Sequence, residues 1–278
     1  MPLVFVPTPL GNLRDVTLRA LDVLRDAELI VAEDTRVARK LLAALGLPGR
    51  PIWSYREQNA ASATEGILER ARTALVAVTT DAGMPGISDP GTALVAAARK
   101  AGVDVEVLPG PSASLGVAVL SGFPLDRFSF EGFPPRAAAA RRAAFSAALQ
   151  RGVTTLWYES PQRVGATLAD LAAVAPEARV FLLREYTKLH EERLDGTPAE
   201  VAARLAEPVR GEIAFVIAPS DARPADGAAE EGANDELDAA IDALLASGRR
   251  LGEIRKALYA RADARKAGGK QARRATHP

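Results

Sequence analysis

Short apolar runs alternate with amphipathic stretches along most of the chain. Each run, bounded by polar or turn-forming residues, predicts a strand, and strands are expected at residues 3–6, 29–32, 52–55, 75–79, 105–108, 128–130, 154–158, 180–184 and 213–217. Between them, apolar residues recur at helical spacing, which predicts helices at residues 17–25, 36–45, 62–72, 92–101, 137–149, 163–173 and 198–206. Strands separated by helices predict an α/β fold with mainly parallel sheets.

The alternation is interrupted near residues 112–122 and then begins again. We therefore expect two α/β domains in tandem, an N-terminal one over residues 1–113 and a C-terminal one over residues 114–220. Prolines and glycines among acidic residues predict a linker over residues 221–233. Two further amphipathic stretches followed by a basic end predict a small helical appendage over residues 234–278.

The amino-acid composition excludes several kinds of functional site. The 278-residue chain has no cysteine, which excludes disulfides, thiolate metal sites and a cysteine nucleophile. Its two histidines, His190 and His277, lie far apart in the sequence, so we expect no metal site. No apolar stretch reaches the roughly 18 residues of a membrane helix, and the first residues carry no targeting signal. These features predict a cytoplasmic protein that does not contact a membrane.

The formal net charge of +0 conceals two segments of opposite charge. Residues 221–242 hold eight acidic residues and one basic residue, whereas residues 249–274 hold ten basic residues and two acidic ones. The basic end is either an electrostatic contact for nucleic acid or a solvated tail. The neutral total therefore does not argue against a nucleic-acid partner.

Turn-rich loops follow several strands, at the sheet edge where open α/β folds bind ligands. In the loop at residues 7–12, Gly11 lets a ligand approach the backbone. In the loop at residues 81–91, Asp81 is expected to accept a hydrogen bond from a ribose hydroxyl or an amino group. Asp89 is expected to cap the following helix, because Pro90 suits its first turn.

Other polar residues at strand ends have two interpretations each. Ser112 is either a helix cap or part of an anion site at a helix N-terminus. Asp34 or Thr35 caps the helix after the second strand, or that segment faces a substrate. In the second half of the chain, residues 158–163 and 184–188 are the polar segments that follow strands.

Seven ordered segments of the chain resemble one family. They are VPTPLGNL at residues 6–13, AEDTR at 32–36, DAGMPGISDPG at 81–91, LPGPSA at 108–113, FEGF at 130–133, YESP at 158–161 and RE at 184–185. Together they resemble the ribosomal RNA small subunit methyltransferase I family, a branch of the tetrapyrrole methylase superfamily, over residues 1–220. The first loop has a single glycine, Gly11, where the wider superfamily often has GxGxG, which favours this RNA-modifying branch.

The resemblance implies 2'-O-methylation of a decoding-centre cytidine in 16S rRNA, with S-adenosyl-L-methionine as the methyl donor. It also implies a donor site between the two domains and a homodimer. The expected cofactor-binding residues are Pro9, Gly11, Asp81, Gly83, Pro85, Gly86, Ile87, Pro109, Ser112, Ala113, Tyr158, Glu159, Glu212 and Ala214. The alternatives are a methylase of a tetrapyrrole or other small molecule, and an RNA-binding ribosome-assembly factor without catalysis.

A ribose hydroxyl is a weak nucleophile, so a general base is expected near it. Asp81, Glu159, Glu185 and Lys188 are the candidates, and we favour Glu159, Glu185 and Lys188 as catalytic residues. The alternative for Glu185 is a structural ion pair with Arg184 or Lys188.

RNA affinity is expected to come from arginine and lysine side chains at phosphates. Two groups of basic residues are the candidates, although a charged run is often only a solvated surface. The first group is Arg36, Arg39 and Lys40, and the second is Arg136, Arg141 and Arg142.

Overall fold

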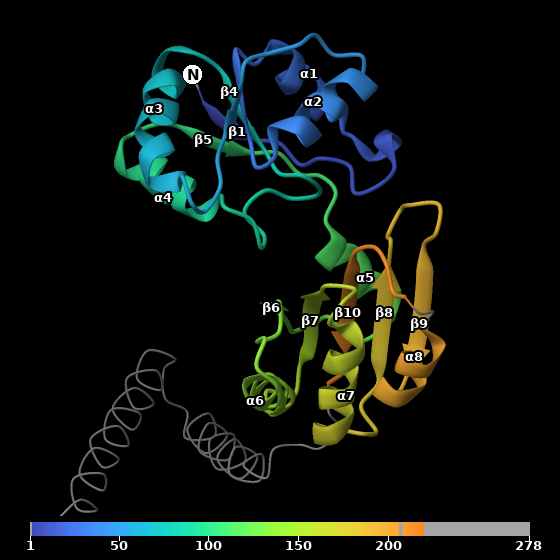
Figure 1. Ribbon diagram of the computed structural model, residues 1–278. Helices are drawn as coiled ribbons and strands as arrows, with labels where there is room; N and C mark the ends of the chain where they lie inside the picture. The colour runs from blue at the N-terminus through green and yellow to red at the C-terminus, as the bar shows by residue number, and fades with distance from the viewer. Residues whose placement is uncertain (1, 206–207, 220–278) are drawn as a thin grey trace, which may run out of the picture. The chain divides into compact units, whose positions relative to one another are not determined.

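The computed structural model describes residues 2–205 and 208–219, which belong to one compact unit, Met1–Asp221. Within it are two five-stranded sheets, each with helices packed against it (Figure 1). The first sheet comes from residues before 113 and the second from residues after it. The domain boundaries remain a proposal. The predicted linker (221–233) and helical appendage (234–278) lie outside the described residues.

The first sheet has the strand order β3-β2-β4-β1-β5, and all its strand pairs are parallel. Its strands are β1 (Leu3–Phe5), β2 (Leu29–Ala32), β3 (Ile52–Ser54), β4 (Val76–Thr79) and β5 (Val105–Val107). The helices of this half are α1 (Leu18–Asp26), α2 (Thr35–Ala44), α3 (Ala60–Thr73) and α4 (Thr92–Lys100), with a 3₁₀ turn at Leu13–Asp15.

The central strands β1, β2 and β4 are buried at every position and are apolar apart from Thr79 at the end of β4, so both faces of this sheet are covered. Leu3 and Phe5 pack toward α3 and α4, and Val4 packs with Leu24 of α1 and Leu42 of α2. The helices therefore cover both faces, and the loops at the strand ends are left to form a site.

The second sheet has the strand order β6-β7-β10-β8-β9. Its strands are β6 (Phe128–Gly132), β7 (Thr154–Glu159), β8 (Val180–Arg184), β9 (Glu192–Gly196) and β10 (Ile213–Ile217). Only β6 and β7 pair in parallel; β10 is antiparallel to β7 and β8, and β8 is antiparallel to β9. The α/β class is confirmed, but the expectation of a mainly parallel sheet holds for the first sheet only.

The antiparallel pairing of β8 and β9 is explained by the short connection between them. Residues 185–191 join β8 to β9, and a parallel pair would need a crossover of about a dozen residues or more. β10 then inserts between β7 and β8, so its beginning lies at the edge where those two strands end. This places three chain segments of the second half at one edge.

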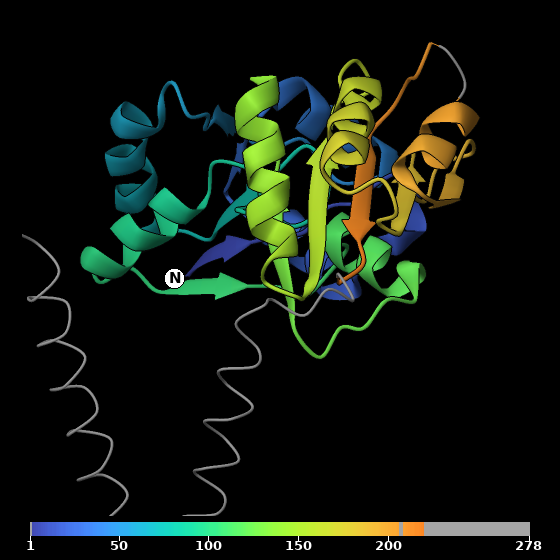
Figure 2. The same ribbon diagram turned by 90° about the horizontal axis from the view of Figure 1, so that it is seen from below.

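The helices of the second half lie on both faces of its sheet. They are α5 (Ala113–Ser121), α6 (Ala138–Leu149), α7 (Val164–Val174) and α8 (Pro198–Arg204). Figure 2 shows α6, α7 and α8 side by side, and their residues Phe145, Leu168 and Val201 share one core cluster. Val117 and Ala118 of α5 belong to the cluster on the other face. Among the described residues no helix is long and apolar enough to cross a membrane.

Two predicted helix caps are confirmed and one is wrong. Asp34 caps α2 by accepting from the Arg36 backbone N–H at 2.8 Å, and Ser112 caps α5. Asp89 does not cap α4, because the helix begins after Gly91, and no side chain caps it. The Asp89 carboxylate is therefore not used by the helix.

Candidate functional site

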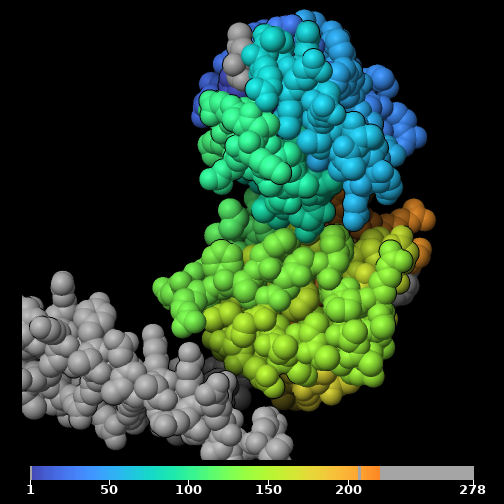
Figure 3. Space-filling view, turned by 90° about the vertical axis from the view of Figure 1, so that its left-hand side faces the viewer, coloured from blue at the N-terminus to red at the C-terminus, as the bar shows by residue number. Residues whose placement is uncertain are grey.

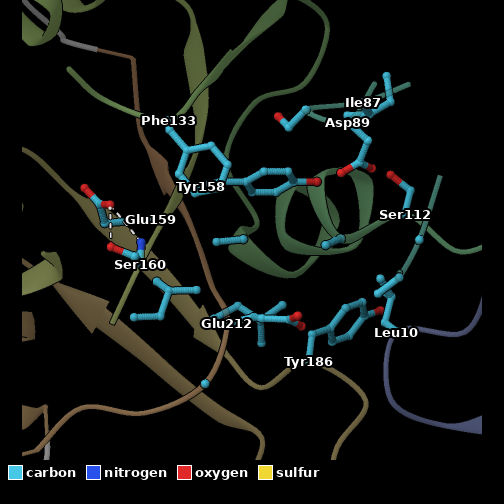
Figure 4. A pocket seen from close by; sticks show the side chains of 18 of the residues that line it. Leu10, Ile87, Asp89, Ser112, Phe133, Tyr158, Glu159, Ser160, Tyr186 and Glu212 are labelled. Atoms are coloured by element: carbon cyan, nitrogen blue, oxygen red, sulfur yellow. Dashed lines mark hydrogen bonds between the residues drawn. The ribbon is translucent and has the colours of Figure 1, made fainter. Parts of the chain in front are cut away.

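A cavity of about 350 Å³ lies where the loops of the two sheets meet (Figure 4). The first half contributes the loops after β1, β4 and β5, and the second half contributes those after β6, β7 and β8 and the segment before β10. Figure 3 shows atoms of the first half (blue to blue-green) directly against atoms of the second (green to orange). The volume is in the range of small-molecule sites, which favours a ligand the size of a nucleoside.

Eight of the predicted cofactor-binding residues line this cavity. They are Gly83, Ile87, Ser112, Ala113, Tyr158, Glu159, Glu212 and Ala214. The other six do not line it: Asp81 and Gly86 line a neighbouring cavity, Pro85 borders a small third one, and Pro9, Gly11 and Pro109 line none of the three.

The cavity also contains residues that sequence reasoning did not select. Leu10, Asp89, Phe133 and Tyr186 point into it in Figure 4 or line its wall. Leu10 and Asp89 lie in loops that were recognised, so their proximity to selected residues was a usable signal. Phe133 and Tyr186 are aromatic residues just after strands. Phe133 ends the FEGF segment and Tyr186 lies in the polar segment 184–188, so their positions beside these segments were the available signal.

Two loops of the first half are joined by a short bridge. Thr8 and Gly83 exchange both backbone hydrogen bonds, at 2.9 and 3.0 Å. Gly83 has φ of +81°, a conformation that side chains rarely adopt, and a Cβ there would come within 3.0 Å of Leu10 Cδ2. Glycine thus keeps this wall of the cavity free of a side chain.

Tyr158 at the end of β7 is fixed from two sides. Its hydroxyl accepts a hydrogen bond from the Ser114 backbone N–H of α5 at 3.1 Å. Its ring packs edge-on against Phe130 and Phe133, with centroids 5.0 and 5.8 Å away. Burial raises the pKa of Tyr158 above its ordinary value of 10.0, so the hydroxyl keeps its proton and remains a donor.

Glu159, a predicted catalytic residue, has a buried carboxylate that is already occupied. It accepts from the Ser160 backbone N–H at 2.7 Å and from the Thr167 hydroxyl at 2.6 Å, and Arg163 lies 3.2 Å away. Such a network favours a role in holding the end of β7 over a role in proton transfer.

Glu185 and Lys188, the other two predicted catalytic residues, form an ion pair. The Lys188 ammonium donates to Glu185 Oε1 at 2.8 Å and to Glu212 Oε2 at 3.0 Å. The hydrogen bond from Lys188 lowers the pKa of Glu185. Partial burial opposes the charged lysine, but the two carboxylates outweigh it and raise the pKa of Lys188. Both shifts stabilise the charged pair, so neither group is a good base, as the ion-pair alternative anticipated.

This ion pair also ties the loops together. The Glu185 carboxylate accepts from the Glu212 backbone N–H at 3.1 Å. A Cβ on Gly211, at φ of +89°, would overlap the Glu185 carboxylate, and one on Gly11 would overlap the Lys188 stem. Gly11 and Gly211 therefore allow close packing around the Lys188 ion pair. For Gly11, the glycine of the first loop, the structure thus indicates a packing role beside the Lys188 side chain.

Asp89 lines the cavity, and none of the ion pairs among residues 2–205 and 208–219 involves it. Burial raises its pKa to about 6, and the negative charges of Glu33 and Asp81 add to that shift, while the Thr80 hydroxyl opposes it. Asp89 and its neighbour Ser88 also line the second cavity, of about 890 Å³. These two residues therefore stand where the two cavities adjoin.

The second cavity is bordered by acidic side chains with defined roles. Asp81 accepts from the Asp34 backbone N–H at 3.1 Å, and Asp34 pairs with Arg36 at 2.6 Å. The hydrogen bond from Arg36 lowers the pKa of Asp34. Burial, and then the charge of Asp81, raises the pKa of Glu33. Within residues 2–205 and 208–219 no group of three or more potential ligands is arranged to hold a metal ion.

The predicted RNA-binding residues differ in exposure. Arg36, Arg39 and Lys40 are exposed on α2, and Arg136 and Arg142 are exposed near the start of α6. Arg141 is only 5% exposed and is bound by Asp170 and by the carbonyls of Pro135 and Arg136. Because its guanidinium faces the interior, Arg141 is excluded from the RNA surface that the sequence predicted.

Comparison with known proteins gives two concordant findings. The sequence model of the family described as Tetrapyrrole (Corrin/Porphyrin) Methylases matches residues 2–202. A protein from Micromonospora olivasterospora, named ribosomal RNA small subunit methyltransferase I, is 43% identical over 227 residues, which are 81% of this chain and 72% of that protein. A protein of the same name from Neisseria meningitidis serogroup B is 38% identical over 267 residues, 92% of this chain and 91% of that protein.

A solved structure shares the fold at lower sequence identity. The uroporphyrin-III C-methyl transferase from Thermus thermophilus, complexed with S-adenyl homocysteine, superposes with a TM-score of 0.55 and is 21% identical. The match covers 78% of this chain and 97% of that one.

Proposed function

We propose, from the premise that this chain belongs to the tetrapyrrole methylase family and to its ribosomal RNA small subunit methyltransferase I branch, that it methylates the RNA of the small ribosomal subunit. The methyl donor is S-adenosyl-L-methionine. The observation that carries the proposal is the cavity at the strand ends, because eight of the residues expected to hold this donor line it.

The chemistry of the cavity fits that donor. Leu10, Ile213 and Ala214 offer an apolar wall for an adenine, and the bare backbone at Gly83 leaves room beside it. The N-terminus of α5, capped by Ser112, suits a carboxylate. Bound there, the donor supplies an electrophilic methyl group on a sulfonium sulfur.

The residues of this chain then serve mainly to bind and orient. Tyr158, held by the Ser114 N–H, presents a hydroxyl that can donate to an acceptor in the cavity. The Lys188 ion pair holds the segment before β10 against the loop after β8. Orientation of this kind supplies a large part of the barrier reduction in group transfer.

The finer proposal is 2'-O-methylation of a decoding-centre cytidine in 16S rRNA. It is supported by the resemblance of the loops and by exposed cations that suit phosphate contacts. The proposed RNA-contacting residues are Arg36, Arg39, Lys40, Arg136 and Arg142.

Methyl transfer from labelled S-adenosylmethionine tests this function directly. Small subunits from cells lacking the modification, free 16S rRNA and a porphyrinogen are offered in parallel. We expect label on the small subunit, in a nucleotide that resists alkaline cleavage, because a methylated 2'-oxygen cannot attack the adjacent phosphate. Label on the porphyrinogen alone, or RNA binding without affinity for S-adenosylhomocysteine, would refute the proposal.

The homodimer that the resemblance implies is also proposed. Leu115 and Val119, at i and i+4 on α5, are 56% and 71% exposed and form an apolar strip. Sedimentation equilibrium is expected to give twice the 29.3 kDa of the chain. Val119→Asp should give one chain mass, whereas Leu18→Asp, at an exposed position of α1, should leave the dimer intact. A wild-type protein that stays at one chain mass at every concentration contradicts the dimer.

A further inference from the structure

We propose that Asp89 accepts the proton of the hydroxyl that is methylated, a role that rests on the proposed function. Asp89 was expected to be a helix cap, but α4 begins after Gly91 and leaves the carboxylate free of that task. In Figure 4 the Asp89 carboxylate and the hydroxyls of Tyr158 and Ser112 surround one part of the cavity.

The other acidic and basic residues at this edge are already engaged. The Glu159 carboxylate is buried against Thr167, Ser160 and Arg163, and Glu185 is neutralised by Lys188. Glu212 shares the same lysine. Among the carboxylates that line the main cavity, Asp89 is thus the one whose charged neighbours are acids instead of cations.

The backbone around Asp89 is held in an unusual conformation. Ser88, the preceding residue, has φ of +65°, which non-glycine residues rarely adopt. Gly86, two residues earlier, has φ of +88°. Such strain persists where the surrounding structure imposes it, and it often occurs where a side chain must be aimed. Here it sets Ser88 and Asp89 at the junction of the two cavities.

This junction suits a reaction between two separate molecules. The main cavity has the walls for the methyl donor, whereas the second cavity is bordered by polar and charged side chains. They include Arg56 and Gln58 beside the acids Glu33, Asp34 and Asp81. A nucleotide that enters through the second cavity meets the donor beside Asp89. In the transfer, the hydroxyl oxygen gains the methyl group, the electron pair of the broken methyl–sulfur bond stays on sulfur, and the hydroxyl proton passes to Asp89 and then to water.

The charges around Asp89 adapt it to this task. The charges of Glu33 after β2 and Asp81 after β4 act on Asp89, and the charges of Asp89 and Glu212 act on Tyr158 of β7. Burial and the two acids raise the pKa of Asp89 to about 6. A base with this pKa is deprotonated at neutral pH and still binds a proton more strongly than an ordinary aspartate does.

The test compares Asp89→Asn with a matched control, Asp22→Asn, at a solvent-exposed position of α1. We expect methyl transfer to small subunits to fall by about 10²–10³-fold in Asp89→Asn and to stay unchanged in Asp22→Asn. The wild-type rate should fall about tenfold per pH unit below pH 6, because protonation removes the base, and the Asn variant should lack this dependence.

Three measurements need no turnover. Carboxyl-¹³C NMR of the wild-type protein should show a titration near pH 6 that is absent from Asp89→Asn. Affinity for S-adenosylhomocysteine, measured by calorimetry, should change by less than about threefold, because the role concerns the hydroxyl and not the donor. The folded-state pKa lies above the ordinary value of 3.8, so the carboxylate destabilises the fold above pH 6, and this effect disappears below about pH 4. Asp89→Asn should therefore melt at the same or a higher temperature than wild type at pH 7.5.

The outcomes separate the two proposals. An active wild type with an equally active Asp89→Asn variant refutes the role of Asp89 alone. Loss of S-adenosylhomocysteine affinity in parallel with activity also refutes it, because Asp89 would then be a binding residue. A wild type that methylates no small subunit refutes the proposed function, and the role on a ribose hydroxyl with it.

Discussion

Replacing Arg141 by Met is expected to lower the free energy of unfolding by about 3 kcal/mol. Its guanidinium is buried, with Nε 2.8 Å from Asp170 Oδ2 and Nη1 3.0 Å from the Arg136 carbonyl. Methionine fills much of the volume but leaves the buried Asp170 carboxylate and two carbonyls with fewer donors. The cost of such unpaired groups exceeds the gain from burying an apolar side chain.

The neighbouring Arg142 provides the matched control. It pairs with the other oxygen of the same carboxylate, Asp170 Oδ1, at 2.7 Å, but its side chain is 45% exposed. Exposed pairs contribute little, so Arg142→Met should cost less than about 1 kcal/mol. Urea unfolding followed by circular dichroism measures both variants. Equal losses in the two variants would contradict the assignment of Arg141 to the core.

The Arg142 variant should also show an effect on RNA affinity. Folded Arg142→Met protein is expected to bind small-subunit RNA more weakly than wild type, with a shallower dependence on salt, because the proposed phosphate contact is lost. Arg141 and Arg142 are adjacent and chemically identical in the sequence. Only the packing of α6 against α7 tells which of them faces Asp170 and which faces solvent.

The first sheet was predictable because its strands are buried on both faces. The runs at β1, β2 and β4 are apolar except for Thr79 at the end of β4, and parallel sheets covered by helices produce that pattern. β9 was missed for the opposite reason. It is an edge strand in which charged residues surround a single buried position, Leu194, so it has no apolar run to recognise.

The directions of the strands in the second sheet could not be predicted from the local pattern of apolar and polar residues. The runs at β8 and β10 read as buried strands whichever way they point. Their antiparallel pairing depends on the short 185–191 connection and on the insertion of β10 between β7 and β8. That insertion also brings Gly211 and Glu212 to the cavity, so the error in topology and part of the site have one origin.

The loops of the site could be recognised from the sequence, but the directions in which their side chains point could not. Asp81 and Asp89 belong to one loop, and helix-capping statistics favoured a structural role for Asp89. The backbone has positive φ values at Gly86 and Ser88, α4 begins only after Gly91, and Asp89 reaches the cavity, which is the reverse of that expectation. Backbone conformations of this kind are set by tertiary packing and leave no reliable trace in a single sequence.

Replacing Gly83 by Val is expected to weaken S-adenosylhomocysteine binding by about 100-fold, which corresponds to about 2.7 kcal/mol. The φ of +81° is unfavourable for a β-branched residue, and the new side chain would press on Leu10, a wall of the cavity. It would also strain the bridge between Thr8 and Gly83, which joins two loops of the site.

A second glycine, Gly46, provides a control that distinguishes the effect of backbone strain from the effect of filling the cavity. Gly46 follows α2 with φ of +67°, and a Cβ there would meet nothing within 4 Å. Gly46→Val therefore introduces similar backbone strain without filling the cavity. Both variants should melt at a lower temperature than wild type, but only Gly83→Val should lose affinity when calorimetry is performed well below both melting points. Retained affinity in Gly83→Val would mean that the donor does not lie against this loop, and equal loss in both variants would mean that binding reports general destabilisation. The predicted asymmetry follows from two features of Gly83 that Gly46 lacks, the neighbouring Leu10 side chain and the bridge to Thr8.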